Sequence, residues 1–315
     1  MKLVLFQDTQ NSAVRAGILT ERGVVDTSGA VAAVSSPQLA IQSLIDRFEH
    51  IRPALETLAV TGAVIPLNEV RLRSPLPRPG KILACIANYW EHAQREARPL
   101  NMFMKNPDAV IGPGDTIELP AFTEPSAFMH EAELALVIKG PAKEVKRDDW
   151  RTAVFGYTCM IDVSARAEGR FTWPKGPPAS WLGKSFDTFA PLGPCIATLD
   201  EIPEPNDLLV RFWDDGQLRH NYSTDDMEHR VPELVEFATK IMTLHSGDLI
   251  SCGTNHEGLG NLQDGETVEI EIERIGRMAL KVSDRLKRTW DRGVYLGENS
   301  TNPAAVRRHR PDPAV

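Results

Sequence analysis

The segment that most constrains the fold is residues 130–138, HEAELALVI, in which two glutamates precede an unbroken apolar run. Side chains along a strand alternate between its two faces, so Glu131 and Glu133 share one face with Ala135, and the residues between them share the other. Both faces are apolar beyond Glu133, which predicts a strand covered on both sides. The two glutamates therefore enter a water-poor region, about 7 Å apart along the strand.

The negative charge of carboxylates in such a region must be compensated. Two ionised carboxylates repel each other and lose hydration, so they need a cation, or one of them must be protonated. Asp162 follows another apolar run, residues 154–161, and adds a third carboxylate where a buried segment emerges. Three oxygen ligands suit Mg²⁺, Mn²⁺ or Ca²⁺ and leave coordination positions open for water and a chelating substrate. The alternative is a strand end whose glutamates reach water or pair with Lys or Arg, with Asp162 as a turn residue.

The chain of 315 residues is long enough for one large domain or two ordinary ones, and 42% hydrophobic content is enough for a buried core. The segment SPLPRPG contains three prolines and a glycine, which hold the backbone extended and mark a boundary. The predicted division is a small N-terminal domain at 1–73, a linker at 74–80, a large β-rich domain at 81–290 and a basic tail at 291–315. A solvated tail is the simpler prediction, and packing of the tail on a partner subunit is the alternative.

Several elements can be placed from local patterns. Ser36-Pro37 predicts the start of a helix, because proline at the first helical position loses no intrahelical hydrogen bond. The other predicted elements are strands at 2–6 and 16–20, a helix opened by Pro232, and a final hairpin of strands at 267–272 and 278–282.

The charge balance bears on partners. Lys and Arg number 35 against 43 Asp and Glu, which gives a formal charge of −8 and argues against nucleic acid or an anionic membrane as partner. We expect a small-molecule partner instead. The apolar start of the chain is broken by Gln7 and Asp8, and no later run reaches the roughly 18 residues of a membrane span. These features predict a soluble, cytoplasmic protein.

The cysteines give no sign of a zinc site or a disulfide framework, because no CxxC pair is present. We expect them to be buried small apolar residues. They are Cys85, Cys159, Cys195 and Cys252.

A set of short motifs, in a fixed order, resembles those of the fumarylacetoacetate hydrolase superfamily over residues 81–282. The resemblance implies a β-rich α+β fold, a mixed β-sandwich roll with a small N-terminal α/β domain, usually as a homodimer. It also implies Mg²⁺ or Mn²⁺ held by Glu131, Glu133 and Asp162, and a 2-oxoacid or 1,3-dicarbonyl substrate that chelates the metal. The motifs are Asn88-Tyr89 with His92, FMK at 103–105, EAE at 131–133, Gly156-Tyr157, DVSAR at 162–166, KSFD at 184–187, PLGP at 191–194, Ser223-Thr224, and Gly247-Asp248 before Gly253-Thr254.

His92 is the candidate base for activating a water. Residues 89–96 are predicted to form a short helical stretch stopped by Pro99, which places Glu96 on the same helix face as His92, where it could orient the imidazole. Similar family members carry a glutamate three positions after the histidine, where this chain has Arg95. Either the role of that glutamate has moved to Glu96 or it is gone. The alternative is an exposed helix with a histidine of no special role.

Other residues are candidates for binding the substrate. Arg166 and Lys184 could each hold a substrate carboxylate or an oxygen that gains charge, and the resemblance favours Lys184 for polarising the carbonyl. It also implies substrate contacts for Tyr89, and Gly253 with Thr254 could donate hydrogen bonds to a carboxylate. The chain departs from the family at residues 255–257, NHE, where a proline commonly follows the threonine, and at 167–169. The substrate is therefore not copied from any relative.

The leading hypothesis is a metal-dependent hydrolase that cleaves a carbon–carbon bond in an acylpyruvate-like acid, as in the catabolism of aromatic compounds. His92 with Glu96 would deprotonate a water, and the metal and Lys184 would stabilise the resulting enolate. The second hypothesis keeps the site and the metal-bound enolate but changes the reaction to isomerisation, decarboxylation, hydration or dehydration of a 2-oxoacid. The third is a metal- or ligand-binding relative without catalysis.

Overall fold

The computed structural model covers most of the chain. The residues it describes are 1–9, 13–30, 35–91, 93, 95–123, 127–166 and 181–290, with the backbone alone at Arg166 and Trp181. The basic tail predicted at 291–315 lies outside these residues, as does His92.

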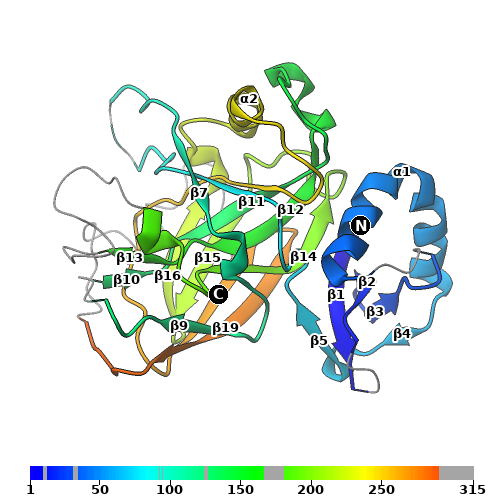
Figure 1. Cartoon of the computed structure of the whole chain (residues 1–315), viewed down its shortest axis with the longest axis horizontal. Helices are drawn as coiled ribbons and strands as arrows, with labels where there is room; N and C mark the ends of the chain where they lie inside the picture. The colour runs from blue at the N-terminus through cyan, green and yellow to red at the C-terminus, as the bar shows by residue number, and fades with distance from the viewer. Residues whose placement is uncertain are drawn as a thin grey trace.

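A large mixed sheet runs through the molecule (Figure 1). Most of its neighbouring strands are antiparallel, and β17 and β6 are parallel. In the described part of the chain the strands follow the order β4 (Val64–Ile65), β3 (Gly23–Asp26), β2 (Arg15–Thr20), β1 (Lys2–Asp8), β14 (Ala190–Thr198), β12 (Val154–Ile161), β11 (Ala132–Ile138), β17 (Leu249–Ser251), β6 (Ile82–Cys85) and β7 (Met102–Lys105), with β5 (Val70–Arg73) beside β1 and β8 (Val110–Ile111) beside β14.

The strand predicted from HEAELALVI is β11, and all seven of its residues are buried. The alternation predicted for it is confirmed. Leu134 and Leu136 belong to one hydrophobic core, whereas Ala135 and Val137 belong to a second. The sheet therefore separates two cores, and β11 contributes side chains to both.

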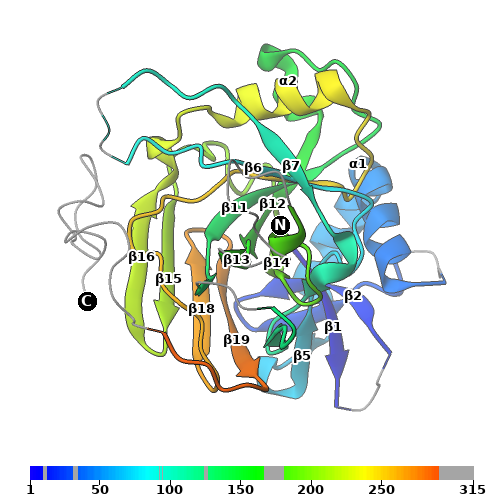
Figure 2. The ribbon, with the colours of Figure 1, turned by 60° about the vertical axis from the view of Figure 1, so that its left-hand side comes forward.

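A second sheet packs over the first core (Figure 2). Alternating apolar side chains along its strands explain this packing. In β18, for example, Val268, Ile270 and Ile272 are all buried in the first core. Its strands are, in order, β16 (Gln217–Ser223), β15 (Leu209–Asp214), β18 (Thr267–Ile272), β19 (Gly276–Asp284) and β9 (Thr116–Leu119), and β10 (Ala127–Met129) pairs separately with β13 (Ser164–Arg166).

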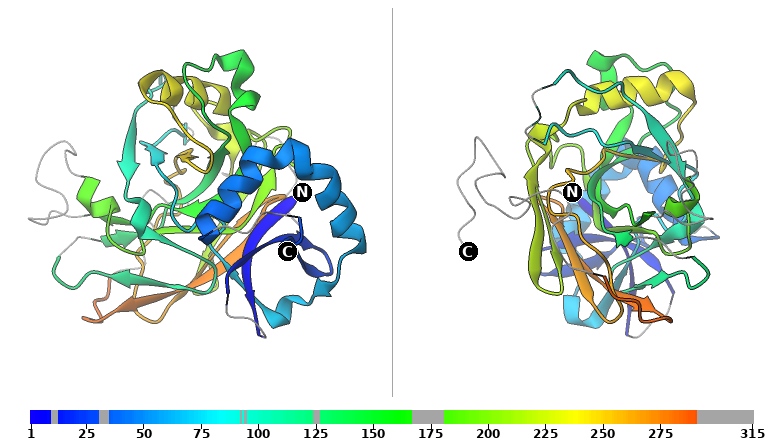
Figure 3. Two further views of the ribbon diagram at one scale, coloured as in Figure 1. Left: turned by 45° about the vertical axis from the view of Figure 1, so that its right-hand side comes forward. Right: turned by 90° about the vertical axis from the view of Figure 1, so that its left-hand side faces the viewer.

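Within the described residues, two α-helices cover the sheets at different places (Figure 3). Helix α1 (Pro37–Thr61) begins where predicted, capped by the Ser36 side chain, and packs against the N-terminal strands in the second core. Helix α2 (Val231–Ile241) buries Leu234 and Val235 in the first core. The short 3-10 helices are η1 (Leu67–Glu69), η2 (Pro107–Ala109), η3 (Arg147–Thr152), η4 (Trp181–Lys184) and η5 (Thr224–Asp226).

The architecture is the β-rich α+β fold that the sequence predicted. The four cysteines are free and buried, as expected. The division at 74–80 stays a prediction; across it, β1 pairs directly with β14 in the large sheet. None of the helices in the described ranges has the length and apolar character that a membrane-spanning helix needs.

Gly156 tests the close packing of β12 against β14. A Cβ atom at Gly156 would lie 2.2 Å from the backbone oxygen of Ala197, so Gly156→Ala forces the two strands apart. We expect this change to lower the free energy of unfolding by about 1–3 kcal/mol in urea denaturation.

Gly29→Ala is the matched control, because a Cβ atom there would meet no heavy atom within 4 Å. It should change the free energy of unfolding by less than about 0.5 kcal/mol. Equal effects of the two substitutions would contradict this account of the β12–β14 contact.

Candidate metal centre and active site

Three buried carboxylates meet where β11 begins and β12 ends. The strands are antiparallel, with Ala132 opposite Ile161, so Glu131 and Glu133 lie beside Asp162. One ligand oxygen from each carboxylate lies within 4.8 Å of the others. The residues are 4%, 1% and 0% exposed, so the predicted burial of the acids is confirmed.

Two lysines enter this acid cluster. Lys184, at the end of η4, places its Nζ 2.8 Å from Glu131 Oε2, 2.6 Å from Asp162 Oδ2 and 2.6 Å from Ser164 Oγ. Lys105, at the end of β7, is 1% exposed and donates to Asp162 Oδ1 at 2.5 Å. Its Nζ also donates to the backbone oxygens of Val163 and Lys184. Lys105 therefore holds both Asp162 and the end of η4.

Glu133 has a raised pKa, which shows that the two lysines do not fully neutralise the charge of the three carboxylates. Its carboxylate accepts hydrogen bonds from Ser251 Oγ and from the Gly253 backbone N–H. Burial, followed by the negative charges of Asp162 and Glu131, nevertheless raises the pKa of Glu133 to about 8.

The donor set fits a divalent cation. When all three carboxylates are ionised, they exceed the two ammonium groups by one negative charge in a dry site, and a hard cation would relieve the repulsion that raises the Glu133 pKa. The Ser251 and Gly253 donors keep the Glu133 carboxylate oriented, as surrounding groups do for metal ligands. One part of the alternative, glutamates that reach water, is wrong, because all three acids are buried. Its other part, pairing with lysine, is observed, since Glu131 and Asp162 both bond Lys184.

The helix predicted over residues 89–96 is wrong. The described residues of this stretch form an isolated turn, closed by the Ala93 N–H and the Trp90 oxygen at 2.8 Å, and no helix. Glu91 in this turn has a φ of +52°, which a right-handed helix excludes. Glu96 is exposed, and the helical spacing that placed it beside His92 is therefore not present. His92 itself lies outside the described residues.

Arg95, which stands where similar family members have a glutamate, is held by an ion pair with the buried Glu228. Arg98 also bonds Glu228. Burial acts to raise the pKa of Glu228, but the hydrogen bonds from Arg95 and Arg98 outweigh it and lower that pKa to about 2. The segment after Glu91 is thus anchored by charge and not by helical hydrogen bonds.

The predicted substrate-binding residues differ in the contacts that they make. Tyr89 is fully buried, with its ring edge-on to Tyr222 at 5.0 Å. Thr254 Oγ1 donates to the backbone oxygen of Ala132 at 2.9 Å, and the Gly253 amide bonds Glu133, so both lie against the acid strand. Arg166 ends β13 opposite Ala127, and its side chain is outside the description. Their contacts with a substrate stay predictions.

Three residues at the acid cluster were not identified as site residues from the sequence: Lys105, Ser164 and Ser251. Lys105 and Ser164 lie within motifs that carried the family resemblance, FMK and DVSAR. A lysine that ends an apolar strand was the available signal for Lys105. Ser251 gave none, because a buried serine in a strand has many ordinary roles.

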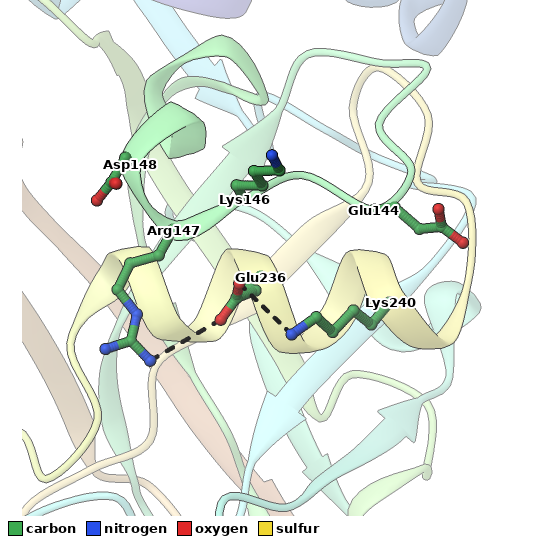
Figure 4. A pocket seen from close by; sticks show the side chains of 6 residues that line it. All are labelled: Glu144, Lys146, Arg147, Asp148, Glu236 and Lys240. Atoms are coloured by element: carbon green, nitrogen blue, oxygen red, sulfur yellow. Dashed lines mark ion pairs between the residues drawn. The ribbon is translucent and has the colours of Figure 1, made fainter.

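A separate surface pocket lies over α2 and is lined by six charged residues (Figure 4). Glu236 pairs there with Arg147 and Lys240 at 3.8 and 3.4 Å. Because these charges compensate one another in exposed positions, the pocket is a weaker candidate than the acid cluster. The residues lining it are Glu144, Lys146, Arg147, Asp148, Glu236 and Lys240.

Comparison with known proteins supports the family resemblance that the order of the motifs indicated. The family described as fumarylacetoacetate (FAA) hydrolase C-terminal matches residues 81–283. A maleylpyruvate hydrolase from Aquipseudomonas alcaligenes is 32% identical over 301 residues, which cover 90% of this chain and 99% of that protein. A mitochondrial oxaloacetate tautomerase from Bos taurus is 32% identical over 297 residues, covering 90% of this chain and 91% of the relative.

A solved structure agrees with both fold and family. It is a maleylpyruvate hydrolase from Sphingobium sp. SYK-6 in complex with manganese(II) ion and pyruvate, and it is 33% identical with a TM-score of 0.78. The similarity covers 90% of this chain and 99% of that one. The family match and these full-length similarities confirm the prediction from the motifs: the chain belongs to the fumarylacetoacetate hydrolase superfamily.

Proposed function

We propose that the protein is a divalent-metal-dependent hydrolase that cleaves a carbon–carbon bond in an acylpyruvate-like 2-oxoacid. The observation that carries this is the buried cluster of Glu131, Glu133 and Asp162 with two lysines. The similarity to maleylpyruvate hydrolases over nearly their whole length, one of them with manganese and pyruvate, supports it. A role in the catabolism of aromatic compounds, a cytoplasmic location and a homodimer belong to the same proposal.

The three carboxylates would hold Mg²⁺ or Mn²⁺, which supplies a Lewis acid for the oxygens of a chelating substrate. Lys184 presents an ammonium group at the point where the carboxylates converge. We assign it the stabilisation of negative charge on the substrate oxygen as the carbon–carbon bond breaks. Lys105 and Ser164 position this ammonium, since one bonds the Lys184 backbone and the other its Nζ. Tyr89, Arg166, Gly253 and Thr254 remain the proposed substrate contacts, and His92 a proposed base.

A second candidate reaction is enolisation without cleavage, as in a tautomerase or isomerase. The specific observation in its favour is Arg95, which occupies the position of the family's glutamate and is committed to Glu228. The similarity to an oxaloacetate tautomerase supports it too. Both candidates use the same acids and Lys184.

The reaction itself gives the first test. Purified protein with Mg²⁺ or Mn²⁺ should remove the enol absorbance of an acylpyruvate and release pyruvate, measured with a coupled dehydrogenase. Turnover of oxaloacetate enol to its keto form, without any pyruvate from the acylpyruvate panel, would favour the second candidate and contradict the hydrolase.

The acid cluster gives a metal-binding test. Glu133→Gln and Asp162→Asn each remove a charged oxygen ligand, so we expect at least about a tenfold loss of Mn²⁺ affinity in isothermal titration calorimetry. Glu21→Gln, at an exposed turn, is the control and should bind Mn²⁺ like the parent protein. An unchanged affinity in both cluster variants would place the metal elsewhere.

Lys184 gives a test of charge stabilisation. Lys184→Gln should lower kcat by about 10²- to 10³-fold, because the lost interaction is made with charge that develops during the reaction. Mn²⁺ affinity should be kept or raised, since the change removes a positive charge from beside Glu131 and Asp162. Lys146→Gln, on the exposed rim of the α2 pocket, should leave kcat unchanged. A Lys184→Gln enzyme with normal kcat would rule out this role.

A further inference from the structure

A histidine and a glutamate from two loops far apart in the sequence are bonded to each other, and the histidine lies three residues after Gly253, whose amide bonds Glu133. His256 Nδ1 lies 2.5 Å from Glu91 Oε1, and the His256 backbone N–H donates to the same oxygen at 2.9 Å. The two side chains are 20% and 23% exposed, so the pair reaches solvent, whereas the acids and lysines behind it are buried.

The two loops that carry the pair are held together by several contacts. Gly253 has a φ of +83°, and a Cβ atom there would lie 2.1 Å from the Ala87 backbone oxygen. Asn88 Nδ2 donates to the backbone oxygen of Cys252 at 2.8 Å. Asp226 joins the two loops again, since its Oδ2 accepts from the Glu91 backbone N–H and from Asn255 Nδ2, each at 3.1 Å. The geometry of the pair therefore does not depend on the single His256–Glu91 contact.

The same loop runs along the strand of metal-ligand candidates. Thr254, two residues before His256, bonds the backbone oxygen of Ala132, which lies between Glu131 and Glu133. Gly253, three residues before His256, donates its backbone N–H to the Glu133 carboxylate at 3.0 Å. These two bonds hold the chain just before His256 against the strand of the acid cluster.

The hydrogen-bonding roles within the pair can be assigned from its chemistry. Burial would raise the pKa of Glu91, but the hydrogen bonds from His256 outweigh burial and hold that pKa below its usual value. An ionised carboxylate only accepts hydrogen bonds, so Nδ1 of His256 carries the hydrogen and Nε2 is the nitrogen with a lone pair. A carboxylate behind an imidazole fixes its tautomer and stabilises the imidazolium, as in the triads of hydrolases.

We propose that His256, positioned by Glu91, is a proton-transfer residue of this active site. The inference rests on the proposed function and gives it a base that the sequence did not identify. Nε2 takes a proton from water as the water oxygen bonds the distal carbonyl carbon of the substrate. When the carbon–carbon bond then breaks, its electron pair forms the enolate of pyruvate, and the proton on Nε2 passes to the carbon that lost the bond. The products are two acids, and His256 is neutral again.

The reverse of the last step is removal of a methyl proton from pyruvate, and it provides a test that needs no cleavage. With Mn²⁺ in D₂O, the protein should exchange the methyl protons of pyruvate for deuterium, followed by mass spectrometry. We expect His256→Gln to lower the exchange rate by at least about 10²-fold. His50→Gln, on the exposed face of α1, should exchange like the parent protein. Mn²⁺ affinity and Tm should be the same in all three proteins.

Further variants separate proton transfer from a structural role of the loop contact. Added imidazole should restore part of the exchange in His256→Ala, because only a missing proton carrier can be replaced from solution. In the metal-free protein, long-range ¹H–¹⁵N spectra should show the hydrogen on Nδ1 of His256, and Glu91→Gln should weaken that preference and lower the exchange rate.

The outcomes distinguish this inference from the proposed function. Parent-like exchange by His256→Gln, no exchange by the parent protein above Mn²⁺ alone, an effect confined to KM, or no rescue of His256→Ala by imidazole would each overturn the role of His256. Exchange that depends on His256, without cleavage of any acylpyruvate, would support the inference and overturn the hydrolase.

Discussion

The placement of negative charge in a dry part of the sheet is the constraint on which the active-site region depends. Antiparallel pairing of β11 and β12 puts Glu131, Glu133 and Asp162 together at one end of two fully buried strands. Such a group is unfavourable unless cations approach it. Lys105 comes from β7 and Lys184 from η4, so segments far apart in the chain are drawn to the same point by charge.

The same interaction links stability to chemistry. A site that is one positive charge short is stabilised by a divalent ion, and the open coordination positions of that ion are what a chelating substrate needs. In the loops around the site, a single residue likewise has two roles. Gly253 helps to orient Glu133 through its amide, and its missing side chain lets the loop of Ala87 pass close by. Metal-ligand orientation and loop packing thus depend on one residue.

Sequence reasoning succeeded where the determinant was local. The period-two pattern of residues 130–138 predicted a strand buried on both faces, and that burial made the acids conspicuous. It failed at residues 89–96, which were predicted to form a short helical stretch stopped by Pro99, whereas Glu91 takes a left-handed backbone conformation. Nothing in the local pattern reveals that conformation, because Asp226 and His256, more than a hundred residues later, hold Glu91 in place. Lys105 was overlooked for a related reason: whether a lysine is buried depends on partners supplied by other strands.

The pairing of β1 with β14 has a consequence for how this chain can vary. Lys2 and Leu3 lie opposite Ala197 and Ile196, and β14 in turn borders β12. One continuous ladder of backbone hydrogen bonds therefore connects the first residues of the chain to β12, the strand that Asp162 directly follows. Exchange of the first 73 residues between relatives would not be the exchange of an independent module. A compatible amino-terminal region must present the same strand edge to β14. Substitutions in β1 and in β14 are therefore expected to be inherited together.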